Sequence, residues 1–296
     1  MGCGGSRSAQ VSTAPDLVAV HPVLDLLKQE VPSSVVVLAG AGISTNAGIP
    51  DFRTPGTGLY DNLHRFNLPY PKAIFDLDFF RSDPKPFSIL AKELWPGSWR
   101  PTLTHLFVKI LNRKKMLLRH YTQNVDGLDR LAGIDQDLIV EAHGSFGSGH
   151  CIDCRDNYSA DFIRDVLFQD QVVHCTSCNG LVKPDITFFG EGLPQRFLDS
   201  WPSDLNAASV VICMGTSLQV MPFASLARRK NCPSAQRILI NREVPTAFGR
   251  TDGDLVLLGE CDKRVLELAE LLGWREELME LYISTRPEEE LDKVTL

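Results

Sequence analysis

The chain has 296 residues, of which 44% are hydrophobic and 23% are charged, and its formal charge at neutral pH is −7. These values are typical of an ordinary globular protein with one large domain and a smaller one, and they exclude a strongly cationic nucleic-acid binder. Basic clusters such as Arg113-Lys114-Lys115 are short. We therefore expect no direct contact with nucleic acid, and a small molecule or a peptide as the substrate.

The N-terminus raises the question of localisation. The chain has no run of about 18 uncharged apolar residues and no secretory signal pattern, so we expect a cytoplasmic protein. Residues 1–20 are small and polar, which predicts a disordered tail. Its start matches the myristoylation pattern at Gly2, and Cys3 is available for a palmitoyl chain. Two lipids would anchor the protein to a membrane, and an unmodified Gly/Ser tail is the alternative.

Short apolar, β-branched runs predict the strands of a parallel sheet. The first run ends in a glycine-rich turn, as a buried strand that feeds a tight turn would. The predicted strands are residues 35–39, 116–121, 138–140, 209–214, 237–240 and 254–258. Helical patterns separate several of them, and residues 262–273 predict a packing helix. This alternation predicts an α/β fold with a doubly wound, Rossmann-like parallel sheet.

Two intervals are too long to be simple connections between strands. Residues 55–100, rich in proline and aromatic residues, predict a loop followed by a helical insertion. Residues 144–185 contain paired cysteines and almost no long apolar run, so they predict a small module that something other than a core stabilises. The remaining predicted parts are the Rossmann-like domain, at 21–54, 101–143 and 186–275, and an acidic C-terminal tail at 276–296.

The cysteine spacing predicts a metal site. Eight cysteines are awkward as disulfides in a cytosolic protein, and four of them form two Cys-x-x-Cys pairs separated by twenty residues. Four thiolates complete a tetrahedral zinc site with no open position for water, so this zinc would be structural. A redox dithiol is the alternative, and the adjacent His150 and His174 are expected to be bystanders. The predicted ligands are Cys151, Cys154, Cys175 and Cys178.

The stretch "AGAGISTNAGIPDFR" follows the first predicted strand. Gly40 and Gly42 allow a tight turn whose amides can face a pyrophosphate at the start of a helix. Thr45 stands where the dehydrogenase fingerprint has a third glycine. The next predicted strand also comes only after the long insertion, so no acidic residue follows at the usual spacing to bind the ribose. An ordinary dehydrogenase is therefore disfavoured.

Polar residues follow several other predicted strands. "TQNVDGL" begins at Thr122, His143 follows the strand at 138–140, and Gly215, Thr216 and Ser217 follow the strand at 209–214. "NRE" at 241–243 follows the next strand. Each group alone reads as a capped turn. Because ligands bind at the carboxyl ends of parallel strands, together they indicate a binding site there.

Together these segments resemble the sirtuin family, over roughly residues 20–270. The matching stretches are "GAGIS" at 40–44, "GIPDFR" at 48–53, "TQNVDGL" at 122–128, "HG" at 143–144, both cysteine pairs, "KPDITFFGE" at 183–191, "GTSLQVMPF" at 215–223 and "NRE" at 241–243. The long stretch that begins with "GTGLYDN", together with "KPDITFFGE", looks most like the class I branch. The resemblance implies an NAD-consuming lysine deacetylase that transfers the acetyl group to ADP-ribose.

The resemblance also implies roles for single residues. His143 would be the general base that activates a ribose hydroxyl, and histidine has the unperturbed pKa for this role. Asn124 would be catalytic and, with Gln123, would hold ribose hydroxyls and a water, while Asp126 would bind the nicotinamide carboxamide. The further expected NAD contacts are Ile49 and Asp51 at the carboxamide; Gly40, Ala41 and Gly42 at the phosphates; Phe52 and Arg53 at the ribose; Gly215, Thr216 and Ser217; and Ser44, Asn241, Arg242, Glu243 and Cys261 on the adenosine side.

The resemblance places the acetylated peptide as an extra strand, held by main-chain hydrogen bonds. The expected substrate contacts are Ile186, Thr187, Phe188, Phe189, Gly190, Glu191 and Val220. Alternation puts Thr187 and Phe189 on one face. Many relatives have valine where Thr187 stands. Threonine is nearly isosteric with valine, so acetyl-lysine should fit, but a buried hydroxyl needs a partner, and the preference for longer acyl chains stays open.

Three alternatives remain. The same fold supports a mono-ADP-ribosyltransferase or a deacylase for longer acyl groups. A non-catalytic module that binds NAD and acetyl-lysine belongs to a different class. The combined presence of Gln123, Asn124, Asp126 and His143 argues against the last alternative.

Overall fold

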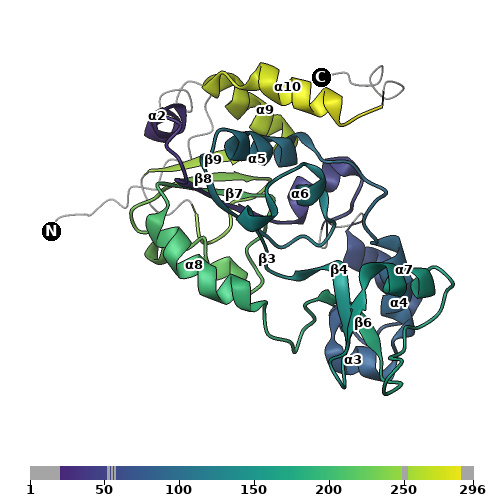
Figure 1. Ribbon diagram of the computed structural model, residues 1–296. Helices are drawn as coiled ribbons and strands as arrows, with labels where there is room; N and C mark the ends of the chain where they lie inside the picture. The colour runs from purple at the N-terminus through teal and green to yellow at the C-terminus, as the bar shows by residue number, and fades with distance from the viewer. Residues whose placement is uncertain (1–20, 52–53, 55, 57, 249–252, 288–296) are drawn as a thin grey trace.

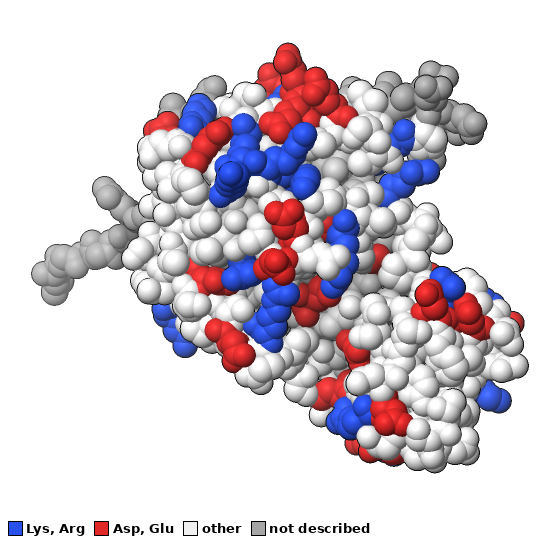
Figure 2. Space-filling view, viewed as in Figure 1, with Lys and Arg blue, Asp and Glu red and all other residues white. Residues whose placement is uncertain are grey.

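The computed structural model describes residues 21–51, 54, 56, 58–248 and 253–287. The chain forms a larger body around a six-stranded sheet and a smaller body around a three-stranded sheet (Figure 1). Within these ranges, no helix has the length and apolar character needed to cross a membrane. Acidic and basic side chains are interspersed over the face seen in Figure 2.

The larger sheet confirms the predicted strands, each to within one residue at either end. Its strands are β1 Val35–Ala39, β2 Leu117–Thr122, β3 Ile139–Glu141, β7 Val210–Met214, β8 Gln236–Asn241 and β9 Asp254–Leu258. All neighbours pair in parallel, in the order β3-β2-β1-β7-β8-β9. The order reverses direction between β1 and β7, and ligands bind at such a switch point, beyond the carboxyl ends of the strands.

Helices cover both faces of this sheet, as expected for a doubly wound fold (Figure 1). Side chains of β1 alternate between two cores: Val35 and Val37 pack on one face, and Val36 and Leu38 on the other. The first face carries α2 Pro22–Lys28, α5 Leu103–Arg113, α9 Cys261–Leu272 and α10 Arg275–Ser284, and the second carries α8 Gln195–Ala207. The shorter elements of this body are α6 Leu128–Leu131 and the 3₁₀ helices η1 Ala41–Ile43, η2 Thr45–Ala47, η5 Gln136–Leu138, η6 Phe223–Ser225 and η7 Arg229–Asn231. The predicted helix at 262–273 is α9.

The expected tail at 276–296 was wrong in its first part. Residues Arg275–Ser284 form α10, which packs against α5 and α9. Leu278 of this helix is fully buried, and Met279 and Leu281 pack against the same core. The predicted packing helix ended at residue 273, and the apolar residues that pack this further helix lie beyond that point.

The smaller body combines both insertions. Its elements are the 3₁₀ helices η3 Leu59–Phe66 and η4 Pro71–Phe75, helices α3 Leu77–Ser82, α4 Lys85–Glu93 and α7 Ala160–Leu167, and strands β4 Gly144–Cys151, β5 Asn157–Ser159 and β6 Val182–Ile186. The sheet is antiparallel, in the order β5-β4-β6.

The structure corrects two expectations about this body. A shared hydrophobic core joins the insertions, since Phe80 and Phe87 from the first pack edge-on against Phe188, with ring centroids 5.7 and 4.7 Å from it. The segment with the paired cysteines was expected to lack a core, but it shares this hydrophobic core with the first insertion. Ile186 and Phe188 lie in this core, so the segment just after residue 185 belongs to the smaller body and not to the Rossmann-like domain. The residues of this core come from segments that are far apart in the chain, so no single segment predicted it.

Candidate active site and metal centre

The turns after β1 and β7 touch at the switch point. Gly42 donates its N–H to the carbonyl oxygen of Gly215 at 2.8 Å, and a Cβ at Gly42 would lie 2.7 Å from Gly215 Cα. Gly40 donates to the Met214 carbonyl at 3.1 Å. Gly40 and Gly42 therefore allow the turns after β1 and β7 to approach each other. The sequence did not predict this contact between the two turns. Two of the amides expected at the phosphates already have partners inside the protein.

The segment after β1 also differs from the expected start of a helix. It forms two 3₁₀ turns, η1 and η2, and Gly48 ends the second with a left-handed backbone, φ +93°. Gly42 within the first turn and Gly40 just before it favour short turns over a continuous helix, because glycine has a low helix propensity. The segment after β1 therefore offers no α-helix N-terminus to the expected phosphate position.

Gln123 and Asn124 follow β2 and lie beside these turns. Thr216 Oγ donates to Gln123 Oε1 at 2.6 Å, which leaves the amide nitrogen of Gln123 as the group it can offer to a ligand. Asn124 Nδ2 donates to the Gly40 carbonyl at 3.3 Å and to Ser44 Oγ at 3.2 Å. Asn124 is buried, and its Oδ1 is the atom suited to accept a hydrogen bond from a hydroxyl or a water.

Asp126 is buried next to Ser44. Ser44 Oγ donates to Asp126 Oδ2 at 2.7 Å, and Leu128 N donates to Asp126 Oδ1 at 2.9 Å. Burial raises the pKa of Asp126, and these hydrogen bonds oppose that shift. Ser44, expected on the adenosine side, thus lies in the same hydrogen-bonded group as Asn124 and Asp126. The side chain of Ser44 turns back toward the segment after β2, and its expected contact on the adenosine side stays a prediction.

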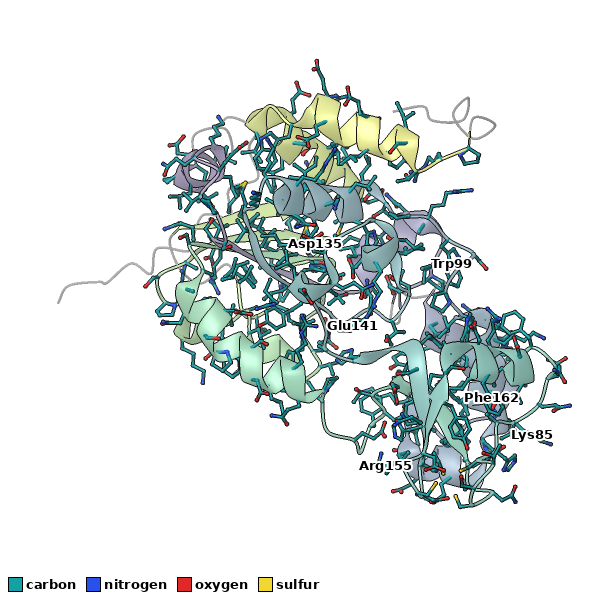
Figure 3. The ribbon with its side chains drawn as sticks, viewed as in Figure 1. Lys85, Trp99, Asp135, Glu141, Arg155 and Phe162 are labelled. Atoms are coloured by element: carbon teal, nitrogen blue, oxygen red, sulfur yellow. The ribbon has the colours of Figure 1, made fainter. Side chains whose placement is uncertain are left out.

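His143 lies where the chain leaves the larger body, two residues after Glu141, which Figure 3 labels. Its Nδ1 lies 3.0 Å from the carbonyl oxygen of Gln123, which can only accept, so Nδ1 carries the proton and Nε2 is free to act as a base. Phe223 lies beside the imidazole, 6.3 Å between ring centroids. Burial lowers the pKa of His143, and the bond to Gln123 partly opposes this shift.

The described residues among the other expected NAD contacts lie on the loop after η2, at the turns after β7 and β8, and at the start of α9. Ile49 is buried, and the carboxylate of Asp51 accepts the Thr54 N–H at 2.6 Å, which holds the following loop. Phe52 and Arg53 lie outside the described residues. Asn241 uses Nδ2 to hold its own turn, at the carbonyls of Thr216 and Glu243. The remaining residues are Ser217, Arg242 and Glu243, which are exposed, and Cys261, which is buried at the start of α9.

The expected substrate residues divide by orientation. Ile186 and Phe188 are buried in the smaller body's core, whereas Thr187 is half-buried and Phe189 is 40% exposed. The predicted alternation is therefore confirmed. Thr187, Glu191 and Val220 are half-buried, and Phe189 and Gly190 are exposed. The carboxylate of Glu191 instead pairs with Lys183, 3.0 Å away.

The four predicted ligands form one cluster. The metal-binding atoms of Cys151, Cys154, Cys175 and Cys178 all lie within 4.8 Å of one another. The close sulfur pairs, Cys151 with Cys178 and Cys154 with Cys175, are each 3.5 Å apart. Sulfur atoms in a tetrahedral zinc site lie about 3.8 Å apart, and a disulfide is much shorter, so the donor set fits structural zinc.

The surroundings of the cysteines agree with that reading. The Tyr158 hydroxyl donates to Cys175 Sγ at 3.1 Å and lowers the pKa of that thiol to about 6. His150 pairs with Asp185 at 2.5 Å, and His174 Nδ1 lies 3.2 Å from the Asn179 carbonyl oxygen. Both histidines therefore stay outside the ligand set, as expected.

His105 is a residue that sequence reasoning missed. It is fully buried, and its Nδ1 accepts the Thr102 N–H at 3.2 Å. Its Nε2 therefore carries the proton and faces Ser44 Oγ at 3.5 Å. The sequence signal was the Thr102-x-x-His105 spacing at the start of α5, a capping box.

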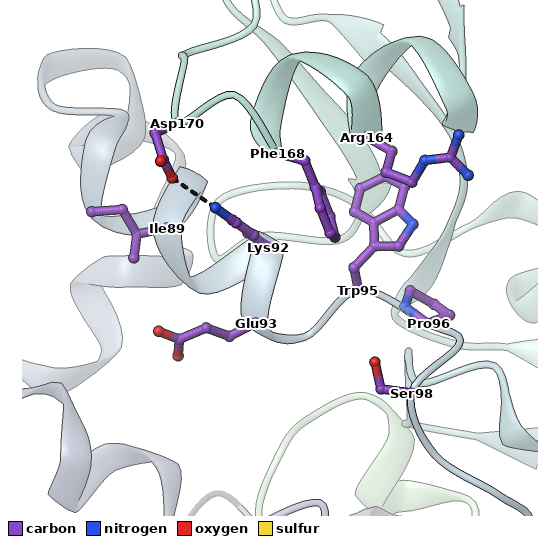
Figure 4. Close-up of a pocket in the computed structure, with 9 residues that line it drawn as sticks. All are labelled: Ile89, Lys92, Glu93, Trp95, Pro96, Ser98, Arg164, Phe168 and Asp170. Atoms are coloured by element: carbon purple, nitrogen blue, oxygen red, sulfur yellow. Dashed lines mark hydrogen bonds and ion pairs between the residues drawn. The ribbon is translucent and has the colours of Figure 1, made fainter.

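A separate hollow of about 610 Å³ lies between α4 and α7 (Figure 4). Trp95 and Phe168 line it, and Lys92 pairs with Asp170 at 2.8 Å at its edge. It contains none of the predicted site residues and lies in the smaller body, away from the switch point. Gln123, Asn124, Asp126 and His143 do not line this hollow, so it is separate from the candidate active site.

Comparisons with known proteins agree with the geometry. A family model described as Sir2 family matches residues 40–222. The chain is 47% identical over 279 residues to the NAD-dependent protein deacetylase hst2 of Schizosaccharomyces pombe, covering 94% of this chain and 83% of the relative. It is 47% identical over 269 residues to the NAD-dependent protein deacetylase sirtuin-2 of Danio rerio, covering 84% and 70%. It is 47% identical over 282 residues to the NAD-dependent protein deacetylase sirtuin-3 of Mus musculus, covering 95% and 82%.

Proposed function

Because the chain belongs to the Sir2 family, we propose that it is an NAD-dependent protein-lysine deacetylase. It acts on acetylated proteins, uses NAD as a consumed co-substrate and carries one structural zinc. NAD supplies the ADP-ribose that accepts the acetyl group, with release of nicotinamide. The observation that carries the proposal is His143, whose Nδ1 is bound to the Gln123 carbonyl, so that its Nε2 carries no proton and can act as a base.

The residues near the expected ribose are suited to this chemistry. His143 Nε2 takes a proton from a ribose hydroxyl. Gln123 offers its amide nitrogen and Asn124 its Oδ1, so these two side chains after β2 are neutral and do not compete as nucleophiles. Asp126, with Ile49 and Asp51, binds the nicotinamide carboxamide. The hydrogen bond from Ser44 to Asp126 supports a place for Ser44 beside the carboxamide as well.

The outer contacts are part of the same proposal. Ala41 and its neighbouring turn meet the phosphates, and Phe52 and Arg53 serve the ribose. Ser217, Asn241, Arg242, Glu243 and the backbone at Cys261 serve the adenosine side. The acetylated peptide adds as a strand between Thr187–Gly190 and Val220, and the exposure of Thr187 and Phe189 supports this placement.

Mass spectrometry of an acetylated peptide tests the function directly. Incubation with the protein and NAD should remove one acetyl mass, and incubation without NAD should change nothing. A gain of ADP-ribose on the peptide or protein would instead favour the transferase, and removal of only longer acyl groups would favour the other deacylase. No change in any mass would favour the non-catalytic binder.

The pH dependence of kcat/KM should report His143. A base acts in its neutral form, and burial holds the pKa of His143 below 6.5. The base is therefore present at neutral pH, and activity should fall only as the pH drops through a value below 6.5. Initial rates between pH 5 and 8, at subsaturating peptide, measure the position of this limb. An acid limb centred above pH 7 would contradict the assignment.

Thr216→Val should weaken NAD binding selectively. The valine keeps the shape but removes the hydroxyl that fixes Gln123 Oε1 at 2.6 Å. We expect the KM for NAD to rise roughly threefold to tenfold, which corresponds to about 1 kcal/mol, with the KM for peptide within about twofold. Thr285→Val, which removes a hydroxyl bound to the Tyr282 carbonyl outside the candidate site, is the control. Equal NAD values for the two variants would contradict the role.

Localisation is a further part of the proposal. We propose a cytoplasmic enzyme whose Gly2 is myristoylated and whose Cys3 is palmitoylated; both residues lie outside the described ranges. Two chains would give stable membrane anchoring where one alone is marginal. Mass spectrometry of the protein from its native host tests this, and an unmodified Gly2 would overturn it.

A further inference from the structure

Lys183 is a buried cation that the proposed mechanism does not use. It lies in β6, and its side chain is 1% exposed. Its ammonium contacts three acceptors: Glu191 Oε2 at 3.0 Å, the Ile186 carbonyl oxygen at 2.7 Å and the Pro184 carbonyl oxygen at 3.2 Å. A lysine ammonium has three N–H groups, so every donor has a partner. The ammonium also lies 4.7 Å from the centroid of the Phe188 ring.

Glu191, the partner of Lys183, also stabilises the turn formed by residues 188–191. The same Oε2 that faces Lys183 accepts the N–H of Phe188 at 2.8 Å. Glu191 in turn donates its own N–H to the Phe188 carbonyl at 3.0 Å. Two hydrogen bonds between the same residues fix the turn, including Gly190, which has φ +97°. The carboxylate of Glu191 is only 15% exposed, and both of the contacts described here are with the turn and with Lys183.

This turn continues the segment beside His143. Thr187 donates its N–H to the carbonyl oxygen of His143 at 2.8 Å. Phe189 donates to the Phe75 carbonyl at 2.7 Å and accepts from Leu77 at 3.2 Å. Three parts of the protein therefore hold the backbone from Thr187 to Gly190. They are His143, the segment between η4 and α3, and the Lys183–Glu191 pair.

We propose that the Lys183–Glu191 ion pair is a positioning device for the acetylated peptide. It holds the backbone of Thr187–Gly190 in the register at which a peptide strand can add beside His143. This inference rests on the proposed function, which assigns that segment to the substrate. Lys183 and Glu191 act through the segment and do not touch the reacting atoms.

Burial of the pair argues for positioning over stability. Taking two charges out of water is costly, and well-packed apolar residues of similar size often stabilise a protein as well or better. An apolar pair, however, would supply no donor for the Ile186 and Pro184 carbonyls and no acceptor for Phe188 N–H. The pair therefore provides what packing alone cannot, a defined backbone geometry at the edge of the substrate segment.

The double variant Lys183→Met/Glu191→Met separates the two roles. It leaves no unpaired buried charge, so the Tm should fall less than in a variant that removes only one of the two charges. The KM for acetylated peptide should rise about tenfold, equivalent to about 1.4 kcal/mol, while the KM for NAD stays within about twofold. Steady-state kinetics with each substrate varied at saturating concentrations of the other gives both values. Unchanged peptide KM, or an equal rise for NAD, would overturn the proposal.

A second pair of variants protects the test against misfolding. Glu191→Gln keeps an oxygen that can accept from both Phe188 and Lys183, so the peptide KM should stay within about threefold. Glu191→Ala removes it and should raise the peptide KM about tenfold. Equal peptide KM for these two variants would count against the pair.

Arg237→Met is the matched control. Arg237 and Asp254 form another buried pair, each 1% exposed, at the amino ends of β8 and β9. Its loss should lower the Tm and leave both KM values near those of the wild type. If the wild type itself removes no acetyl group, the proposed function fails; fluorescence anisotropy of a labelled acetyl-peptide then still compares Glu191→Gln with Glu191→Ala. Equal affinities there would overturn the positioning role separately.

Discussion

Replacing His143 with tyrosine is expected to lower the kcat for deacetylation by about 10²–10⁴-fold, the range that a general base contributes. The wild-type imidazole donates from Nδ1 to the Gln123 carbonyl and keeps Nε2 unprotonated, and a phenol cannot supply that base near neutral pH. NAD binding should remain measurable, because Gln123, Asn124 and Asp126 keep their own partners. Mass spectrometry of an acetylated peptide gives the rate, and calorimetry gives NAD affinity.

His21→Tyr is the control for this variant. His21 is another half-buried histidine, bound through Nδ1 to the Val23 N–H at the start of α2, outside the candidate site. It should lose some stability through its helix cap and retain turnover. Full activity of His143→Tyr, or equal losses in the two variants, would refute the role of His143 as the base.

Removing zinc is expected to abolish activity by unfolding the smaller body. Structural zinc sites bind with apparent free energies of about 10–16 kcal/mol, which matches or exceeds the total stability of a typical domain. The cluster holds the ends of β4 and the segment before β6, and β6 leads directly to Thr187. A Cys154→Ser variant should lose bound zinc, melt at a lower temperature and lose turnover together, as measured by elemental analysis, circular dichroism and peptide assays.

Cys232→Ala provides the comparison. Cys232 is buried and lies outside the four-cysteine cluster, so its loss should keep zinc content and activity and lower stability only modestly. The structural role would be wrong if a zinc-free protein, prepared with a chelator, kept both its fold and its turnover. Activity that depended on zinc while the fold stayed intact would also contradict a closed four-sulfur site.

Much of the architecture was predictable because its signals are local. Strands such as β1 and β7 are short runs rich in β-branched residues, and burial on both faces of a sheet favours such runs whatever their neighbours are. The spacing of the cysteines likewise predicts a four-sulfur site before any fold is known, because each Cys-x-x-Cys knuckle presents two thiols by itself.

The errors share a cause in long-range packing. The smaller body's core forms only when Phe80 and Phe87 of one insertion meet Phe188, about one hundred residues later in the chain, so neither segment showed a core alone. Leu278 of α10 packs into the core of the larger body, and this segment was expected to be part of a tail. The hydrogen bond from Ser44 to Asp126 likewise forms because the turns after two different strands face each other.

The sequence by itself determined the chemical inventory: a doubly wound sheet, four metal-binding thiols, and a histidine, amides and a carboxylate at strand ends. Periodicity and spacing encode these features over a few residues. Only the tertiary structure decided which atoms remain available to a ligand. Gly42 N–H, Thr216 Oγ and the Glu191 carboxylate are each used by residues from other segments, and hydrogen bonds between distant segments exist only after the chain has packed.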